Sequence, residues 1–230
     1  MMGSAMARVA SKPVVRCPWP TVDDPIYLKY HDEEWGVPVH DDRTIFEFLV
    51  LEAFQAGLSW RTVLYKRPAL RQAFAGFDAR RVARFGARDI NRLLRNAGII
   101  RNRQKVVAAI NNASRFLEVQ QEFGTFAKYM WSWVGHRPVL HRWRTLRDYP
   151  PYTEDAVAWA KDLKRRGFSF LGPTVVYAHM QAVGMVNDHT VDCFRYRVLA
   201  RGIPTRHTRR DRGQGGEEAA VSGFATPWTR

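Results

Sequence analysis

Apolar side chains recur at helical spacing along most of this 230-residue chain, and no segment alternates between apolar and polar residues as a half-buried strand does. The clearest example lies within residues 104–121, where the helical stripe comprises Val106, Val107, Ile110, Ala113, Phe116 and Leu117. The length suits one compact domain, and apolar residues make up 46% of the chain. The sequence therefore predicts an all-α fold and excludes a wholly disordered or collagen-like chain.

Capping and stop signals divide this pattern into separate helices. Asp41 or Asp42 can cap a helix that Gly57 ends, and a break is expected at Pro68 inside the next helix. The expected helices cover residues 43–57, 60–75, 78–85, 87–98, 104–121, 153–167 and 173–185. Residues 17–42 and 138–153 have no such pattern, so we expect them to be irregular.

The chain is strongly basic, with a net charge of +14, and more than half of that charge lies near its ends. Residues 1–16 contribute +3 and residues 195–230 contribute +5. We expect a disordered basic extension over 1–16, a helical domain over 17–196 and a disordered Arg-rich tail over 197–230. A charge balance of this kind is typical of proteins that meet a polyanion, and the tail could contact DNA loosely.

The sequence also indicates a cellular setting. The apolar-rich stretch over 45–60 is too short and too polar to span a bilayer, and the first sixteen residues have no apolar core of signal-peptide length. Two cysteines are too few for a secreted disulfide scaffold. We therefore expect a cytoplasmic protein without a membrane partner.

Each cysteine has a histidine nearby in the sequence. Cys17 precedes His31 with thirteen residues between them, and His189 and Cys193 stand at positions i and i+4. Together they form the Cys2His2 set of a structural zinc site, which would join the two ends of the body. The alternative is two buried thiols beside ordinary histidines.

A second candidate site lies at the predicted turn between the last two long helices, in the sequence GFSFLG. Such a helical hairpin can expose glycine N–H groups at the start of its second helix, where the dipole also favours an anion such as a DNA phosphate. An ordinary turn between two helices is the alternative. The segment NAGIIRNRQKVVAAI resembles a second tight helical turn followed by basic residues.

Glu52 is the third candidate, since it lies within an apolar helix and cannot share a solvated stripe with Glu47. The sequence around this helix is rich in aromatic residues, namely Trp19, Tyr27, Tyr30, Trp35 and Trp60. Aromatic rings beside a carboxylate suit a pocket that stacks a flat ring and bonds its polar edge. The alternatives are a solvent-facing glutamate and an aromatic core that only packs the domain.

These features occur within four blocks that resemble 3-methyladenine DNA glycosylase I. The blocks are CPW…DPIYLKYHDEEWGVP, LEAFQAGLSWRTVL, NAGIIRNRQKV and RGFSFLGPTVVYAHMQAVGMVNDH, followed by Cys193. Their order and spacing also match, and the resemblance covers roughly residues 17–196. It implies a helix-hairpin-helix DNA glycosylase fold and a base excision repair hydrolase that releases 3-methyladenine from alkylated double-stranded DNA without cutting the strand.

The resemblance also implies roles for individual residues. One structural Zn²⁺ per chain is expected at Cys17, His31, His189 and Cys193. Glu52 is expected to act on the base as the catalytic residue, and the base-binding aromatic residues would be Tyr27, Tyr30, Trp60, Trp19 and Trp35. Gly57 and Leu58 match a wedge that enters the DNA, and the phosphate would be held by Arg166, Gly167, Gly172 and Thr174. We expect a monomer.

Two departures and two alternatives accompany this interpretation. Phe54 stands where the family often has glutamine, which suggests an altered pocket wall. Asn187 takes the place where other members of the superfamily carry a catalytic aspartate, in agreement with this family. A non-catalytic binder of damaged DNA would not need Glu52 with its aromatic set. A broad alkylbase glycosylase would be expected to carry the missing aspartate.

Overall fold

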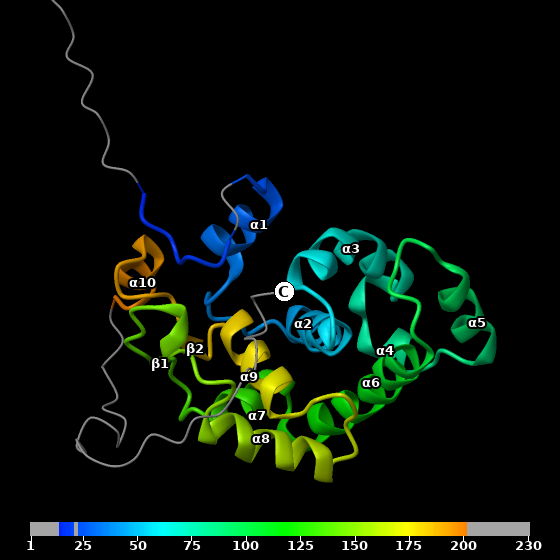
Figure 1. Cartoon of the computed structure of the whole chain (residues 1–230). Helices are drawn as coiled ribbons and strands as arrows, with labels where there is room; N and C mark the ends of the chain where they lie inside the picture. The colour runs from blue at the N-terminus through cyan, green and yellow to red at the C-terminus, as the bar shows by residue number, and fades with distance from the viewer. Residues whose placement is uncertain (1–13, 21–22, 202–230) are drawn as a thin grey trace, which may run out of the picture.

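The computed structural model describes residues 14–20 and 23–201, and these residues are mostly helical (Figure 1). Most of the two extensions predicted to be disordered, 1–16 and 197–230, lies outside the described residues, but residues 197–199 of the predicted tail belong to helix α10 (Phe194–Leu199). The α-helices are α1 (Pro25–Lys29), α2 (Asp42–Gln55), α3 (Trp60–Ala73), α4 (Ala79–Val82), α5 (Ala87–Arg95), α6 (Arg103–Phe123), α7 (Phe126–Ser132), α8 (Glu154–Arg165), α9 (Pro173–Ala182) and α10 (Phe194–Leu199). Shorter helical segments are the π-helix η1 (Tyr30–Glu34) and the 3-10 helices η2 (Ala75–Phe77) and η3 (Leu146–Asp148).

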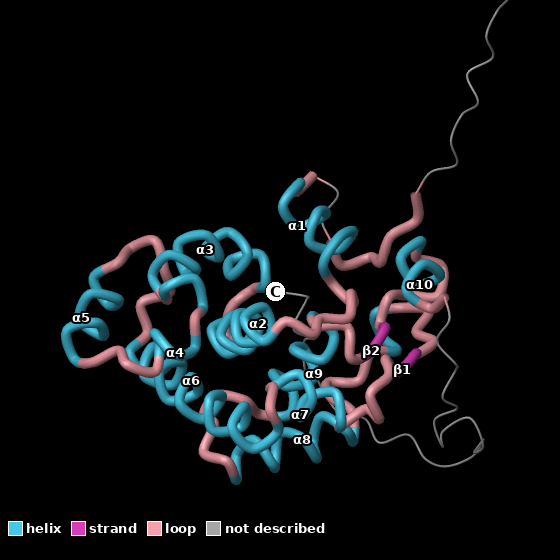
Figure 2. Tube along the Cα trace, turned by 180° about the vertical axis from the view of Figure 1, so that it is seen from behind, coloured by secondary structure: helices cyan, strands magenta, loops and turns pink. Residues whose placement is uncertain are grey.

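Helix α2 is the centre of the fold. Every residue from Ile45 to Gln55 is buried, and α2 contacts α3, α6, α7 and α9. A helix that is enclosed on all sides in this way lies in a core rather than on a surface. Its start follows the predicted signal, because the Asp41 carboxylate accepts a hydrogen bond from the Thr44 N–H at 2.8 Å. Figure 2 shows α2 between α3 and α9.

Two predictions about local structure are wrong. Helix α3 continues through Pro68 without a break, although proline removes one backbone hydrogen bond. Val63, Leu64 and Leu70 on either side of it are buried, so packing holds the helix together. Residues 17–42 and 138–153 are not wholly irregular either. The first segment contains α1 and η1, and the second contains strand β1 (Val139–Leu140) and η3.

The two ends of the described chain meet at one side of the molecule, where α1, α10 and a small sheet lie together (Figure 1). Strands β1 (Val139–Leu140) and β2 (Val186–Asn187) pair in parallel. Gly184 has φ +71°, and a Cβ there would lie 2.4 Å from the carbonyl carbon of Val37. Only glycine therefore allows the segment before β2 to pass the N-terminal segment. Within the part of the chain that the structure describes, we find no helix long and apolar enough to cross a membrane.

Candidate active site and metal centre

The four predicted metal ligands come together in one buried cluster. The Cys17 Sγ lies 3.4 Å from His189 Nδ1, and the Cys193 Sγ lies 3.5 Å from the same atom and 3.6 Å from His31 Nε2. All four ligand atoms lie within 4.8 Å of one another. A tetrahedral zinc ion with ordinary bond lengths would separate sulfur from nitrogen by about 3.6 Å, so the cluster has the right size for such an ion.

In both histidines, the outer ring nitrogen, which faces away from the cysteines, lies within hydrogen-bond distance of an oxygen. His31 Nδ1 lies 2.7 Å from Asp32 Oδ1, and His189 Nε2 lies 3.0 Å from the carbonyl oxygen of Trp35. If each outer nitrogen donates to its oxygen, the inner nitrogens, His31 Nε2 and His189 Nδ1, present lone pairs to the two sulfurs. Hydrogen bonding from Cys17 lowers the pKa of Cys193, while burial raises the pKa of Cys17. This donor set suits a divalent cation.

A cavity of about 150 Å³ lies between the C-terminal end of α2 and the start of α9. Its lining includes Glu52, which is 1% exposed and whose two carboxylate oxygens have no hydrogen-bond partner within the described residues. Burial raises the pKa of Glu52 well above its ordinary value. Glu47, on the same helix, is paired with Arg67 and Arg71 at 2.6 Å each. Glu52 is therefore a buried carboxyl group that still needs donors.

The five predicted aromatic residues are all buried, and they pack as one group rather than as the cavity wall. The ring centroids of Trp19 and Trp35 lie 4.9 Å apart, and those of Tyr30 and Trp60 lie 5.3 Å apart. Burial raises the pKa values of Tyr30 and Tyr27, and the negative charge of ionised Glu52 raises both of them further. The Tyr30 hydroxyl has no hydrogen-bond partner among the described residues. Tyr30 also packs on Phe48, one helical turn before Glu52 on α2, at a centroid distance of 6.4 Å.

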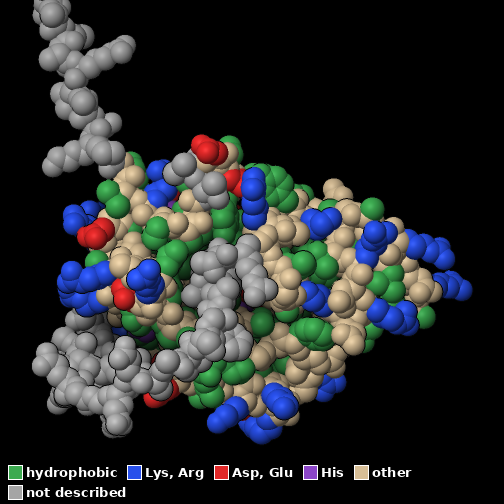
Figure 3. All heavy atoms as spheres, in the orientation of Figure 1, with side chains coloured by type: hydrophobic (Ala, Val, Ile, Leu, Met, Phe, Trp, Pro, Cys, Tyr) green, Lys and Arg blue, Asp and Glu red, His purple; other side chains and the backbone are tan. Residues whose placement is uncertain are grey.

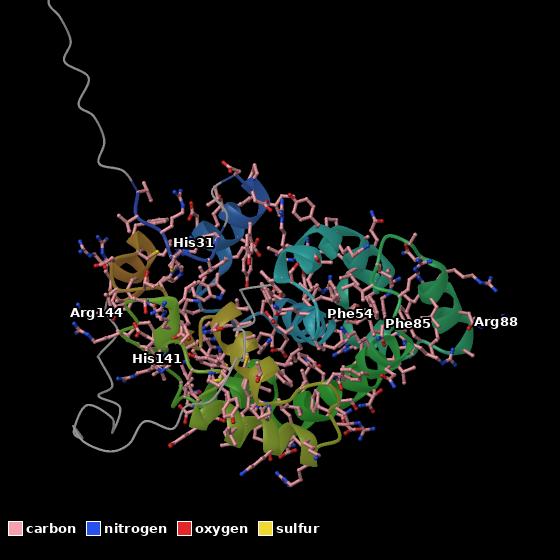
Figure 4. All side chains as sticks on the ribbon, in the orientation of Figure 1. His31, Phe54, Phe85, Arg88, His141 and Arg144 are labelled. Atoms are coloured by element: carbon pink, nitrogen blue, oxygen red, sulfur yellow. The ribbon has the colours of Figure 1, made fainter. Side chains whose placement is uncertain are left out.

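One helical segment supplies both the aromatic group and the metal cluster. Asp24 caps α1 and forms an ion pair with Arg61 of α3 at 2.6 Å, which fixes α1 against α3. The chain then enters the π-helix η1, whose first two residues are Tyr30 and His31. Tyr30 packs on Trp60, and the neighbouring His31 reaches the cysteines. Figure 4 shows His31 at the metal-cluster end of the molecule.

The turn after α2 forms the lip of the cavity. Gly57 has φ +77°, a conformation that favours glycine, and Leu58 is 38% exposed. Leu58 is therefore not a core residue. Beneath the turn, the buried Lys105 of α6 donates from Nζ to the carbonyl oxygens of Phe54 at 2.8 Å and Ala56 at 2.5 Å. Sequence analysis did not single out Lys105, because a lysine at the start of a helix usually faces water.

The turn between α8 and α9 lies on the other side of the cavity. Gly167 has φ +85°, Gly172 is the N-cap of α9, and Thr174 and Val175 line the cavity. The amides in the first turn of α9 have no intrahelical acceptor, and they lie at the positive end of its dipole. The buried Asn112 of α6 holds this turn, since it accepts from the Ser169 N–H at 2.8 Å and donates to the Ser169 carbonyl at 2.9 Å.

Arg166 is engaged differently from the prediction. Its guanidinium donates to Glu122 at 2.6 Å and to Asp162 at 2.7 Å, and it lies over the rings of Phe123 and Tyr129. The ion pairs hold the guanidinium against α6 and α8, and the Tyr129 ring contacts it from α7. The arrangement gives no support to Arg166 as a phosphate ligand, because two carboxylates already neutralise it.

Phe54 also differs from what the sequence suggested, and Asn187 has a defined partner. Phe54 is fully buried and packs against Phe74 at a centroid distance of 5.7 Å, and it is not among the residues that line the cavity. Asn187 lies in β2, where it donates to the carbonyl of Tyr196.

Asp188 is a buried aspartate that the sequence did not single out. It accepts hydrogen bonds from His141, Trp143, Tyr177 and Gln181. Burial opposes its charge, but these donors lower the pKa of Asp188. His141 is labelled in Figure 4.

Comparison with known proteins shows what the chain is similar to. The chain is 46% identical over 181 residues to DNA-3-methyladenine glycosylase 1 of Escherichia coli, which covers 79% of this chain and 96% of that relative. A crystal structure of 3-methyladenine DNA glycosylase I superposes with a TM-score of 0.76 at 47% identity, covering 78% of this chain and 98% of the other. A variant of such an enzyme in complex with 3-methyladenine superposes with a TM-score of 0.75 at 38% identity over 77% of this chain and 95% of the other. The profile of the methyladenine glycosylase family matches residues 19–196, and the chain belongs to that family.

Proposed function

We propose that this protein is a monofunctional DNA-3-methyladenine glycosylase, a cytoplasmic monomer that hydrolyses the N-glycosyl bond of 3-methyladenine in double-stranded DNA and leaves an abasic site. The observation that carries the proposal is the buried carboxyl group of Glu52, which faces a cavity and lacks any donor among the described residues. A polar group buried in this way is costly unless a ligand supplies its hydrogen bonds. Membership of the methyladenine glycosylase family supports the same activity.

Recognition of the base would depend on Glu52 and the aromatic group. The exocyclic amine of adenine is a donor where guanine carries an acceptor, so the Glu52 carboxylate favours adenine at that edge. Tyr27, Tyr30 and Trp60 do not line the cavity, so they would have to turn toward the flipped base to stack against it, with Trp19 and Trp35 behind them. A ring with a positive charge gains further from electron-rich aromatic faces. The cationic lesion would also favour the ionised form of Glu52.

Cleavage of the glycosidic bond of 3-methyladenine needs little catalytic help beyond recognition of the base. N3-methylation makes the base cationic in DNA, so the glycosidic bond is already weak and the base leaves neutral. No acid has to protonate the leaving group, and this agrees with the engagement of Asn187 in β2 and of Asp188 with four donors. Glu52 would hold the base through its exocyclic amine, and water would attack the sugar carbon as the neutral base leaves.

Two turns would hold the duplex on either side of the cavity. Leu58 at the lip would fill the space that the flipped nucleotide leaves, and Gly57 allows the sharp turn that exposes it. The amides at Gly172 and Thr174, at the start of α9, would bind a phosphate, with Gly167 shaping the turn. The two helices α8 and α9 would thus act as the helix-hairpin-helix of this glycosylase.

The buried Cys2His2 cluster would hold one structural Zn²⁺. Its closed set of four protein ligands leaves no open position, so the ion would link the N-terminal segment to the end of the domain and would not act on the base. Cys17 and His31 belong to the first of these parts, and His189 and Cys193 to the second.

The test of the proposed function is release of free base. Purified protein is incubated with methylated duplex DNA, and the released bases are separated by chromatography. We expect 3-methyladenine and intact strands with abasic sites. DNA that is bound tightly while no base is released would instead identify a non-catalytic binder.

A further inference from the structure

The basic charge of the folded body is concentrated in one segment. Residues 78–103 contain eight arginines and two aspartates, a net charge of +6, which equals the net charge of all residues from 17 to 194. These arginines lie on α4 and α5, in the segments that follow each of them, and at the first residue of α6, and all of them are exposed. We call this surface the arginine face; it comprises Arg80, Arg81, Arg84, Arg88, Arg92, Arg95, Arg101 and Arg103.

The arginine face has almost no counter-charge. Arg92 pairs with Asp89 at 3.2 Å, and the other seven arginines form no ion pair within residues 14–20 and 23–201. Asp78 caps α4 and lies 3.6 Å from Arg43, which is outside the face. Like charges that gather without partners repel one another, and a bound polyanion removes that repulsion.

The face adjoins the lip of the cavity. Lys66 of α3 donates to the carbonyl oxygens of Ala97 and Gly98, between α5 and α6. Lys105, two residues after Arg103, donates to the carbonyl of Ala56 beside the Leu58 turn. The face therefore begins next to that turn and extends away from it over α5. Figure 3 shows Lys and Arg side chains gathered over the end of the molecule that α4 and α5 form.

We propose that the arginine face binds the phosphate backbone of double-stranded DNA on one side of the damaged nucleotide, beyond the base pairs next to the lesion. This inference rests on the proposed function, because the lesion in the cavity fixes where the duplex lies. The contacts are to phosphates, so they add affinity without sequence preference. The face makes the binding site asymmetric, since α8 and α9 lie on the other side of the cavity.

The test compares charge variants on duplexes of different length. The variant carries Arg81→Gln, Arg88→Gln and Arg95→Gln, three exposed residues without ion pairs. The matched control carries Arg142→Gln, Arg144→Gln and Arg147→Gln, which are also exposed and lie in the segment before and within η3. Figure 4 shows Arg88 and Arg144 at opposite ends of the molecule. The DNA contains a non-cleavable abasic analogue with about 15 base pairs on both sides, or with one side shortened to about 4, a length less than half a helical turn.

Binding is measured by fluorescence anisotropy at several salt concentrations. Wild type is expected to lose affinity when one of the two flanks is shortened. Its affinity should stay unchanged when the other flank is shortened instead. The affinity of the arginine-face variant for the long duplex should equal the affinity of wild type for the duplex in which that flank is shortened. Its slope of log affinity against log salt should fall by about 0.9 for each phosphate that the variant no longer neutralises, up to about 2.7. The control variant should keep the dependence on the flank.

Two outcomes would overturn the inference: equal affinity of wild type for both shortened duplexes, or equal loss in the variant and the control. Affinity for free 3-methyladenine and excision at saturating enzyme should not change in the variant. A wild-type protein that releases no base would refute the proposed function, whereas one that releases base without dependence on a flank would refute this inference alone.

Discussion

Replacing Glu52 by glutamine should make the stability of the free protein less dependent on pH and should weaken binding of the base. The carboxyl group is 1% exposed, and neither oxygen has a donor among the described residues. Burial raises its pKa well above the ordinary value of 4.5. At a pH between the unfolded-state and folded-state pKa values, the folded protein therefore holds a proton that the unfolded chain has released. Stability from this group is complete below about pH 4.5, and it is lost as the pH rises through the folded-state pKa.

The size of the effect follows from this linkage. Between the unfolded and folded pKa values, the wild type loses about 1.4 kcal/mol of stability for each pH unit, and Glu52→Gln loses none by this route. From pH 5 to pH 7 the difference in free energy of unfolding between the two proteins should grow by up to about 3 kcal/mol. For a chain of this size that corresponds to about 6–12 °C in melting temperature.

The assay is chemical denaturation of both proteins at pH values from about 4.5 to about 8, a range that spans the ordinary pKa of a glutamate and neutral pH. Titration of the metal cluster affects both proteins, so it cancels in the difference. Glu118→Gln removes an exposed carboxylate and serves as the control, with a change within about 0.5 kcal/mol. Saturating 3-methyladenine should reduce the pH dependence of the wild type, because the base supplies a donor. A difference between wild type and Glu52→Gln that stays constant with pH would refute the reasoning.

Three further variants test the other parts of the site. Cys193→Ser should lower zinc content well below one ion per chain by elemental analysis and destabilise the fold by about 4 kcal/mol or more, since zinc binding contributes to folding. Leu58→Ala should slow excision from duplex DNA, change stability by less than about 1 kcal/mol and leave free-base binding unchanged; proportionate loss of all three would contradict the wedge. Lys105→Met should leave two carbonyl oxygens unpaired, cost about 1–3 kcal/mol and slow duplex excision more than it weakens free-base binding, and equal losses would contradict a role at the turn.

Local signals predicted the parts of the fold that depend on neighbouring residues. Residue type alone predicted an N-cap at Asp41 or Asp42, and the structure shows that Asp41 is the cap. The meeting of Cys17 and His31 with His189 and Cys193 was predicted from residue chemistry, and it is also confirmed as a cluster. The sequence failed at Pro68, because packing of α3 outweighs the hydrogen bond that proline removes.

Residues whose roles depend on distant partners could not be predicted. Arg166 precedes a glycine turn, which favoured a phosphate ligand, but its partner Glu122 lies 44 residues earlier in the chain. The same applies to Asp188, whose donors come from residues 141–143 and from α9. Asp188 has four hydrogen-bond donors, whereas Glu52 has none among the described residues. No local sequence pattern distinguishes these two situations, so only the structure shows the difference.

The spacing between the two turns at the cavity is another property that no local pattern contains. Lys105 and Asn112 lie seven residues apart on α6, so they share a face and are separated by about 10.5 Å along the helix axis. Lys105 holds the carbonyl end of α2 beside Leu58, and Asn112 holds both backbone groups of Ser169. One helix therefore fixes both turns, and the distance between them follows from the helical rise rather than from either loop. A motif search finds each turn, but their separation across the cavity is set by two buried side chains on a third element.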